Sequence, residues 1–132
     1  MLFTFNVDTN EREEFVNIDA LVDEAVKKSG IKNGVATVFT PHTTAGITIN
    51  ENADPDVTRD LVYGMNVTFD NKKEYRHAEG NTDSHMKSSL TGASETLIIE
   101  AGSVIYGTWQ STYFAEFDGP RTRRVHVKII EG

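Results

Sequence analysis

The stretch "ETLIIEAGSVIYGTWQSTYFAEFDGPRTRRVHVKII", residues 95–130, decides the fold class of this chain. Aromatic and β-branched residues dominate it in short runs, which the glycine-containing turns "AGS" and "DGP" separate. Such runs between turns are typical of β-strands. The pattern therefore predicts strands at residues 95–100, 103–107, 108–117 and 122–130.

Three more strands and three helices are predicted before residue 95. The strands cover residues 2–7, 34–40 and 46–50, and the helices cover residues 17–30, 54–65 and 81–92. Asp54 and Pro55 form a strong helix start, because aspartate caps helices well and proline suits the first helical position. Asn81 or Thr82 is expected to cap the third helix. Strands at both ends of the chain with helices between them predict an α+β fold.

The composition is that of one soluble domain. The chain has 132 residues, of which 38% are hydrophobic and 25% charged, so residues 1–132 are expected to form a single domain. The absence of cysteine excludes disulfides and thiolate metal sites. We find neither a leader nor an apolar run of membrane length, so we expect a cytoplasmic location and no membrane contact. The net charge of −7 argues against nucleic acid as a partner.

A first group of candidate functional residues lies in "HTTAGITINENADPD", residues 42–56. His42 falls on a turn between two predicted strands, and Glu51 and Asn52 lie in the connection to the second helix. Loops at strand ends often carry catalytic groups. Helix capping explains Asp54 well, but local structure explains His42 and Glu51 poorly. The stretch is therefore predicted to form one wall of a pocket.

A second group lies in "YRHAEGNTDSHMK", residues 75–87. Its candidates are His77, Asn81, His85 and Lys87. Exposed backbone N–H groups at the start of the third helix would favour an anion near Asn81. Together with His42, the two histidines and nearby carboxylates make a divalent metal possible, although no compact motif such as HExxH is present. The alternative is that these are ordinary exposed or hydrogen-bonded loop histidines.

The third group is Gln110, Glu116 and the basic segment "PRTRRVHVK", residues 120–128. Arginine holds phosphate well through paired N–H donors, which makes Arg121 and Arg123 candidate ligands for a small anion. The alternative for the segment is a solvated edge strand that uses positive charge against aggregation. Glu116, in turn, could pair with these arginines in a structural cross-strand ion pair.

Two long motifs resemble one known family. "HTTAGITINENADPDV" and "GNTDSHMKSSLTGASETLIIEAGSVIYGTWQSTYFAEFDGPRTRRV" are similar to the YjbQ-like family, also called secondary thiamine-phosphate synthases. The resemblance implies a small α+β β-sandwich, here of seven predicted strands in two sheets with two to three helices. It also implies a homotrimer with sheets packed about the three-fold axis. The implied activity is weak thiamine-phosphate synthesis, in which hydroxymethylpyrimidine diphosphate and thiazole phosphate are joined and pyrophosphate leaves.

The family's polar motif positions, read onto that reaction, suggest roles for the candidate residues. The expected catalytic residues are His42, Glu51, His85 and Glu116; the expected substrate-binding residues are Asn52, Asn81, Lys87, Gln110, Arg121 and Arg123; the expected metal ligands are His42, His77 and His85, with Mg or Zn as the ion. Two alternatives stay open at this point. One is a non-catalytic trimer that binds a metal or a phosphate ligand, and the other is an unidentified phosphate-ester hydrolase or transferase.

Overall fold

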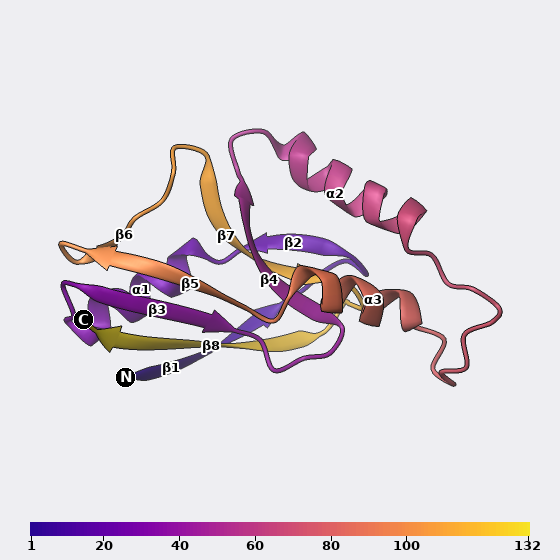
Figure 1. Ribbon diagram of the computed structural model, residues 1–132, viewed down its shortest axis with the longest axis horizontal. Helices are drawn as coiled ribbons and strands as arrows, with labels where there is room; N and C mark the ends of the chain where they lie inside the picture. Colours follow the sequence, from indigo (N-terminus) through magenta and orange to yellow (C-terminus); the bar gives the residue numbers. More distant parts are fainter.

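Two antiparallel β-sheets form the centre of the protein, as the computed structural model of residues 1–132 shows (Figure 1). The larger sheet has the strand order β1 (Leu2–Asp8), β8 (Thr122–Glu131), β3 (Gly34–Phe39), β5 (Ser94–Glu100) and β6 (Ser103–Val104). The smaller sheet has the order β2 (Glu14–Asn17), β7 (Gln110–Glu116) and β4 (Ala45–Glu51). The α+β class and the two-sheet arrangement predicted from the sequence are therefore confirmed.

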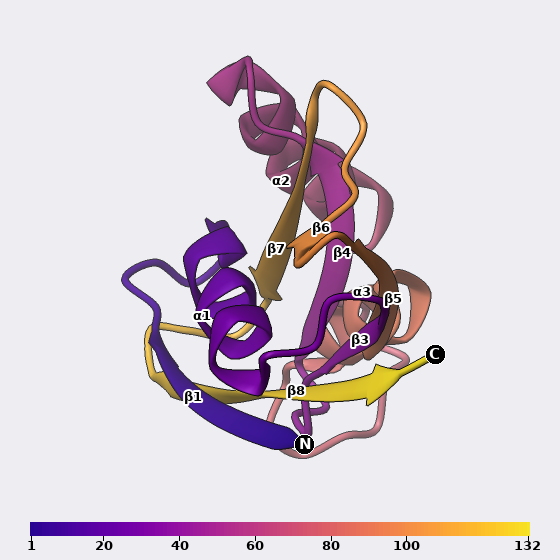
Figure 2. The ribbon, with the colours of Figure 1, turned by 90° about the vertical axis from the view of Figure 1, so that its left-hand side faces the viewer.

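Alternating side chains build the core between the two sheets. On β8, Val125, Val127 and Ile129 are buried, whereas Arg124 before them and Lys128 between the last two are exposed. This period of two is expected for a strand with one face on the core and the other in solvent. Helix α1 (Asp19–Ser29) packs against the same core, as Figure 2 shows, and contributes its own buried residues, Val22, Ala25 and Val26.

The other two helices differ in how firmly they are attached. Helix α3 (Thr82–Thr91) lies on β4, where the Ser88 hydroxyl donates to the Ala45 carbonyl at 2.6 Å. Helix α2 (Pro55–Thr68) has no buried residue and projects from the body of the molecule (Figure 1). None of the three helices is both long enough and apolar enough to cross a membrane.

Several local predictions need correction. Strand β2 was not predicted, because its four residues follow the charged run "NEREE" and show no long apolar pattern. The predicted strand at 103–107 is only two residues long, and α2 runs three residues past its predicted end. The capping role of Asp54 is confirmed, since its carboxylate accepts from the Asp56 N–H at 2.9 Å. Asn81 occupies the predicted N-cap position of α3, but its side chain makes no capping hydrogen bond.

Candidate functional site

A polar cavity of about 330 Å³ lies where three separate segments of the chain meet. The segments are the β3–β4 loop, the chain entering α3, and the turn from β7 into β8. The lining residues are Pro41, His42, Thr43, Thr44, His77, Glu79, Asn81, His85, Asp118, Arg121 and Arg123. Apart from Pro41, every one carries a polar side chain. The cavity therefore suits a small hydrophilic ligand.

His42 reaches this cavity from the loop that follows β3. Strand β3 ends at Phe39, which pairs with His126, so the next stretch of β8 has no strand partner on that side. The imidazole fills the gap, because its Nε2 accepts a hydrogen bond of 2.9 Å from the Arg124 backbone N–H. Partial burial, together with the positive charges of Arg123 and Arg124, lowers the pKa of His42 below its ordinary value.

A buried ion pair lies beneath the cavity, beside His42. Arg123 and Glu116 are 3% and 0% exposed, and the Arg123 Nε donates to both carboxylate oxygens at 2.9 and 3.1 Å. Arg123 also donates to the Thr44 hydroxyl at 2.8 Å, and Thr9 donates to Glu116 at 2.8 Å. Burial alone would raise the pKa of Glu116, but the hydrogen bonds from Arg123 and Thr9 outweigh burial, so this pKa lies below its ordinary value.

Glu116 therefore has the structural role that was the alternative in the sequence analysis. Its carboxylate is inaccessible and does not line the cavity, so the prediction that Glu116 acts on a substrate is not supported by its position. The pair joins β7, the central strand of the small sheet, to the first residues of β8. Arg123 does line the cavity, but its guanidinium already serves Glu116 and Thr44.

The opposite wall comes from the start of α3. Asn81 donates from Nδ2 to the Asp118 carboxylate at 2.8 Å, which ties the helix to the β7–β8 turn. Arg121 lies 3.3 Å from the same carboxylate and keeps about half of its side chain exposed, at 51%. The rings of His77 and His85 meet edge to face, with centroids 5.2 Å apart. This wall thus places two imidazoles, a carboxylate and a partly free guanidinium around one space.

Two lining carboxylates had no role predicted from the sequence. Glu79 belonged to the second group of polar residues but received no role, and Asp118 was interpreted only as part of the turn "DGP". Asp118 lies two residues before the basic segment 120–128, and this position was the one local feature of the sequence that pointed to a role in the site. Its contact with Asn81, 37 residues earlier in the chain, depends on the tertiary fold.

Three predicted residues lie far from the cavity. Glu51 pairs with Gln110 at one end of the β4–β7 ladder, whereas Ala45 pairs with Glu116 at the cavity end. Six residue steps along a strand separate the two ends by about 20 Å. Asn52 lies beyond Glu51 and hydrogen-bonds to Ser111. The prediction that residues 42–56 form one continuous wall is therefore wrong within this chain, because only the segment up to Thr44 reaches the cavity.

Lys87 is another correction. Its side chain is 0% exposed, and its Nζ donates to Glu13 at 2.7 Å and to Asn66 at 2.6 Å. The Asp83 carboxylate lies 3.6 Å from the same nitrogen. A lysine with these partners is unavailable to a substrate, so its predicted binding role is wrong, and it anchors α3 instead.

The three predicted metal ligands His42, His77 and His85 all line the cavity. Their side chains are not arranged to bind one ion, however, since no group of three or more histidine and carboxylate side chains in this structure could hold a metal ion. Nε2 of His42 is already used by the Arg124 N–H. The side chains as placed do not fit a preformed metal site, and the metal stays a prediction.

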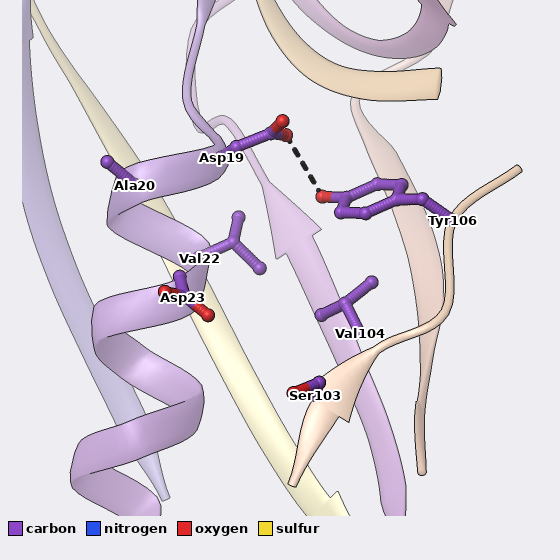
Figure 3. Close-up of a pocket in the computed structure, with 7 residues that line it drawn as sticks. All are labelled: Asp19, Ala20, Val22, Asp23, Ser103, Val104 and Tyr106. Carbon is purple, nitrogen blue, oxygen red and sulfur yellow. Dashed lines mark hydrogen bonds between the residues drawn. The ribbon is translucent and has the colours of Figure 1, made fainter. Parts of the chain in front are cut away.

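A second cavity, of about 360 Å³, lies between α1 and β6 (Figure 3). Its main polar group is Asp19, whose Oδ1 accepts from the Tyr106 hydroxyl at 3.1 Å and from the Thr112 N–H at 2.8 Å. Burial raises the pKa of Tyr106 to about 12. Because Asp19 has its donors within the fold and no imidazole or arginine lines this space, the His-rich cavity is the better candidate for chemistry near neutral pH.

Comparison with known proteins identifies the family. The model of the family described as UPF0047 protein YjbQ-like matches residues 3–132, and the chain belongs to that family. The UPF0047 protein MJ1081 of Methanocaldococcus jannaschii is 50% identical over 130 residues, covering 98% of this chain and 94% of the relative. The UPF0047 protein YugU of Bacillus subtilis is 49% identical over 131 residues, covering 98% and 99%.

Solved structures support the same relationship. A YjbQ/UPF0047 family protein from Clostridium acetobutylicum superposes with a TM-score of 0.95 at 52% identity, covering 97% of this chain and 99% of that one. A protein of unknown function from Sulfolobus solfataricus gives a TM-score of 0.94 at 30% identity, covering 100% and 97%. The resemblance in the motifs is thus confirmed at the level of family and fold.

Proposed function

We propose that this protein is a small-molecule enzyme that acts on phosphorylated substrates in the His-rich cavity. The observation that carries the proposal is the convergence of three of the chain's four histidines on one polar space with Glu79, Asp118 and Arg121. Imidazoles exchange protons near neutral pH, and guanidinium groups hold phosphate oxygens. An assembly of such groups from separate loops is the arrangement expected of an active site.

The residues of the proposed site differ in whether their side chains are already bonded to other groups of the chain. Arg121 is half exposed and able to bind a phosphate group, whereas Arg123 is held by Glu116 and contributes a fixed positive charge. The imidazoles of His77 and His85 make no hydrogen bond within the chain, which leaves their ring nitrogens available to a ligand. They are the proposed proton carriers. No step is assigned to a metal, because the side chains do not form a metal-binding group.

The specific reaction we propose is weak thiamine-phosphate synthesis, which the family resemblance suggests. The bond from the pyrimidine's methylene carbon to the diphosphate oxygen breaks, the thiazole nitrogen forms a bond to that carbon, and pyrophosphate leaves. In this reaction positive charge develops at the carbon and negative charge on the leaving group. Positioning of the substrates and electrostatic stabilisation of these charges would therefore supply most of the rate acceleration. Arg121 and Arg123 would stabilise the leaving pyrophosphate.

The test is an assay of pyrophosphate release with the two phosphorylated substrates. His85→Ala should lower kcat/KM by about 100-fold or more, the usual range for loss of a proton-transferring group. Tyr63→Ala is the control, because Tyr63 is 69% exposed on α2 and lies outside both this cavity and the large sheet. If the His85 variant turns over substrate as fast as the control, the synthase proposal fails for this cavity.

Two alternatives have distinct outcomes in the same experiment. A non-catalytic binder would be stabilised against heat by inorganic phosphate or a metal, by RT ln(1 + [L]/Kd), without turnover. A phosphate-ester hydrolase or transferase would release phosphate from one substrate alone. The observation that favours these alternatives is the hydrophilic lining, since a pyrimidine and a thiazole ring would find no apolar side chain in this cavity.

We also propose that the protein assembles as a homotrimer through the open face of the large sheet. That face exposes large apolar side chains from four strands: Leu2, Phe39, Ile98 and Ile130, which are 41% to 61% exposed. Apolar side chains gathered on one face of a sheet are typical of protein interfaces. Glu51, Asn52 and Gln110 serve the proposed reaction only where another copy brings them to the cavity, because within one chain they lie at the far end of the small sheet.

A further inference from the structure

The hydrogen bond between His42 and β8 determines where the imidazole carries its proton. A backbone N–H can only donate, so the Nε2 atom that accepts from Arg124 at 2.9 Å must be unprotonated. In a neutral imidazole the other ring nitrogen then carries the hydrogen. His42 is therefore the Nδ1–H tautomer, with a donor on the nitrogen that makes no hydrogen bond within the chain.

The hydrogen bond from the Arg124 backbone N–H maintains the Nδ1–H tautomer of His42, and no titratable side chain takes part in that bond. The Arg124 N–H lies beyond the end of β3 and has no carbonyl acceptor there, so the imidazole replaces the missing strand. Protonation of Nε2 would place two donors against each other and leave the N–H unpaired. The charged groups that face this region come from β7, β8, the turn between them, α3 and the loop before α3: Arg121, Arg123, Arg124, Glu116, Asp118, His85, His77 and Glu79.

We propose that His42 is a binding residue with a fixed Nδ1–H donor that holds an anionic oxygen of the ligand, and that it neither transfers a proton nor binds a metal through Nε2. The tautomer follows from the fold alone, whereas the identity of the ligand rests on the proposed function. Arg121 and the hydroxyl of Thr43 line the same cavity and add donors of the same kind. Proton transfer then falls to His77 and His85.

Nitrogen NMR tests the tautomer directly. Protein labelled with ¹⁵N-histidine is examined at pH 7.5 by long-range proton–nitrogen correlation, and the His42 signals are assigned by their loss in His42→Gln. We expect the pattern of a neutral ring with hydrogen on Nδ1. A hydrogen on Nε2, or fast exchange between the two tautomers, overturns the proposal.

Two substitutions then separate the roles of the two ring nitrogens. In His42→Asn the amide N–H₂ lies near the position of Nδ1, which keeps the donor and loses the acceptor for Arg124. In His42→Gln the amide oxygen reaches toward the Nε2 position, which keeps the acceptor and loses the donor. The probe is inorganic phosphate, titrated by calorimetry, and Tyr63→Gln on the exposed face of α2 is the control for a substitution outside the cavity.

We expect the asparagine variant and the control to bind phosphate within about threefold of the unsubstituted protein, and the glutamine variant to bind about tenfold more weakly, as loss of one hydrogen bond to a charged oxygen predicts. Any result in which the glutamine variant binds at least as tightly as the asparagine variant overturns the donor role. If the unsubstituted protein does not bind phosphate, the donor role toward phosphate is likewise overturned, while the NMR result still decides the tautomer. If the synthase assay shows no activity, the proposed reaction fails, but the tautomer found by NMR and the phosphate affinities found by calorimetry are unaffected.

Discussion

At the scale of single residues, the ion pair of Glu116 and Arg123 connects stability to the candidate site. Both side chains are buried, and Arg123 also hydrogen-bonds Thr44 in the cavity wall. The pair keeps two charges out of water, and removing one partner leaves the other uncompensated in the interior. The position of the cavity floor therefore depends on both groups.

We predict that Glu116→Gln destabilises the fold by about 3–5 kcal/mol at pH 7, because it leaves the Arg123 charge unpaired. Urea unfolding measures the change. The control is Asp23→Asn, which removes an exposed partner of Lys27 and should cost less than about 1 kcal/mol. A Glu116 variant as stable as this control contradicts the prediction.

The same residue predicts how stability changes with pH. The folded pKa of Glu116 lies below its ordinary value of 4.5, so its contribution is fully present above pH 4.5 and is lost as pH falls through the folded pKa. The difference in unfolding free energy between the unsubstituted protein and Glu116→Gln should therefore be largest near neutrality and shrink in acid. Urea titrations at a series of pH values below 5 measure this difference in unfolding free energy. A difference that grows as the pH falls contradicts the prediction.

At the scale of elements, α3 decides the position of Asn81 and His85, and two of the contacts that attach it involve Lys87 and Gly46. One is the buried Lys87 with Glu13. The other is the close approach of α3 to β4 at Gly46, where an added Cβ would lie 2.8 Å from the Thr91 methyl and 2.9 Å from the Gly92 carbonyl. Each contact can be tested with a matched residue elsewhere.

We predict that Lys87→Met destabilises the protein by about 1–3 kcal/mol, because the buried carboxylates of Glu13 and Asp83 lose one of their two cationic partners and keep only Arg12. Lys27→Met is the control, since the Lys27–Asp23 pair is exposed and worth less than about 1 kcal/mol. Thermal and urea unfolding compare the two variants. Adding Glu13→Gln to Lys87→Met should recover part of the loss, because it leaves Arg12 with one buried carboxylate to neutralise instead of two.

We predict opposite effects from two Gly→Ala substitutions. Gly46→Ala should cost about 1–3 kcal/mol, because the methyl group meets α3 and backbone atoms that must shift. Gly64→Ala should stabilise the protein by about 0.5–1 kcal/mol, because Gly64 lies inside α2 with nothing within 4 Å of the new carbon. Unfolding midpoints measured side by side decide both signs.

At the scale of the whole molecule, the open face of the large sheet is the surface left without a partner. We predict that the protein sediments as a trimer and that Ile98→Glu shifts it toward the monomer, because a charge replaces an apolar side chain in the proposed interface. Ile98 is 59% exposed in the single chain. Val67→Glu on α2, where Val67 is 63% exposed, is the control and should leave the trimer intact. Equal sedimentation of all three proteins as monomers contradicts the proposal.

The local parts of the fold were predictable from the sequence for local reasons. Alternation along residues 122–130 marks the core face of β8, and Asp54 with Pro55 marks the start of α2. Strand β2 was not predictable in this way, because its four residues become a strand only by pairing with β7. The candidate site was predictable in part, since the types and approximate places of His42, His77, His85 and Arg121 were visible in the motifs.

The sequence by itself determined the fold class, most of the elements and the inventory of imidazole, carboxylate and guanidinium groups, because strand periodicity, caps and residue types are properties of short segments. Only the tertiary structure decided which of those groups share a cavity. The register of β4 against β7 carries Glu51 to the far end of the sheet, and the packing of α3 buries Lys87 while leaving His85 at the cavity. These outcomes depend on contacts between residues distant in the chain, which no short segment contains.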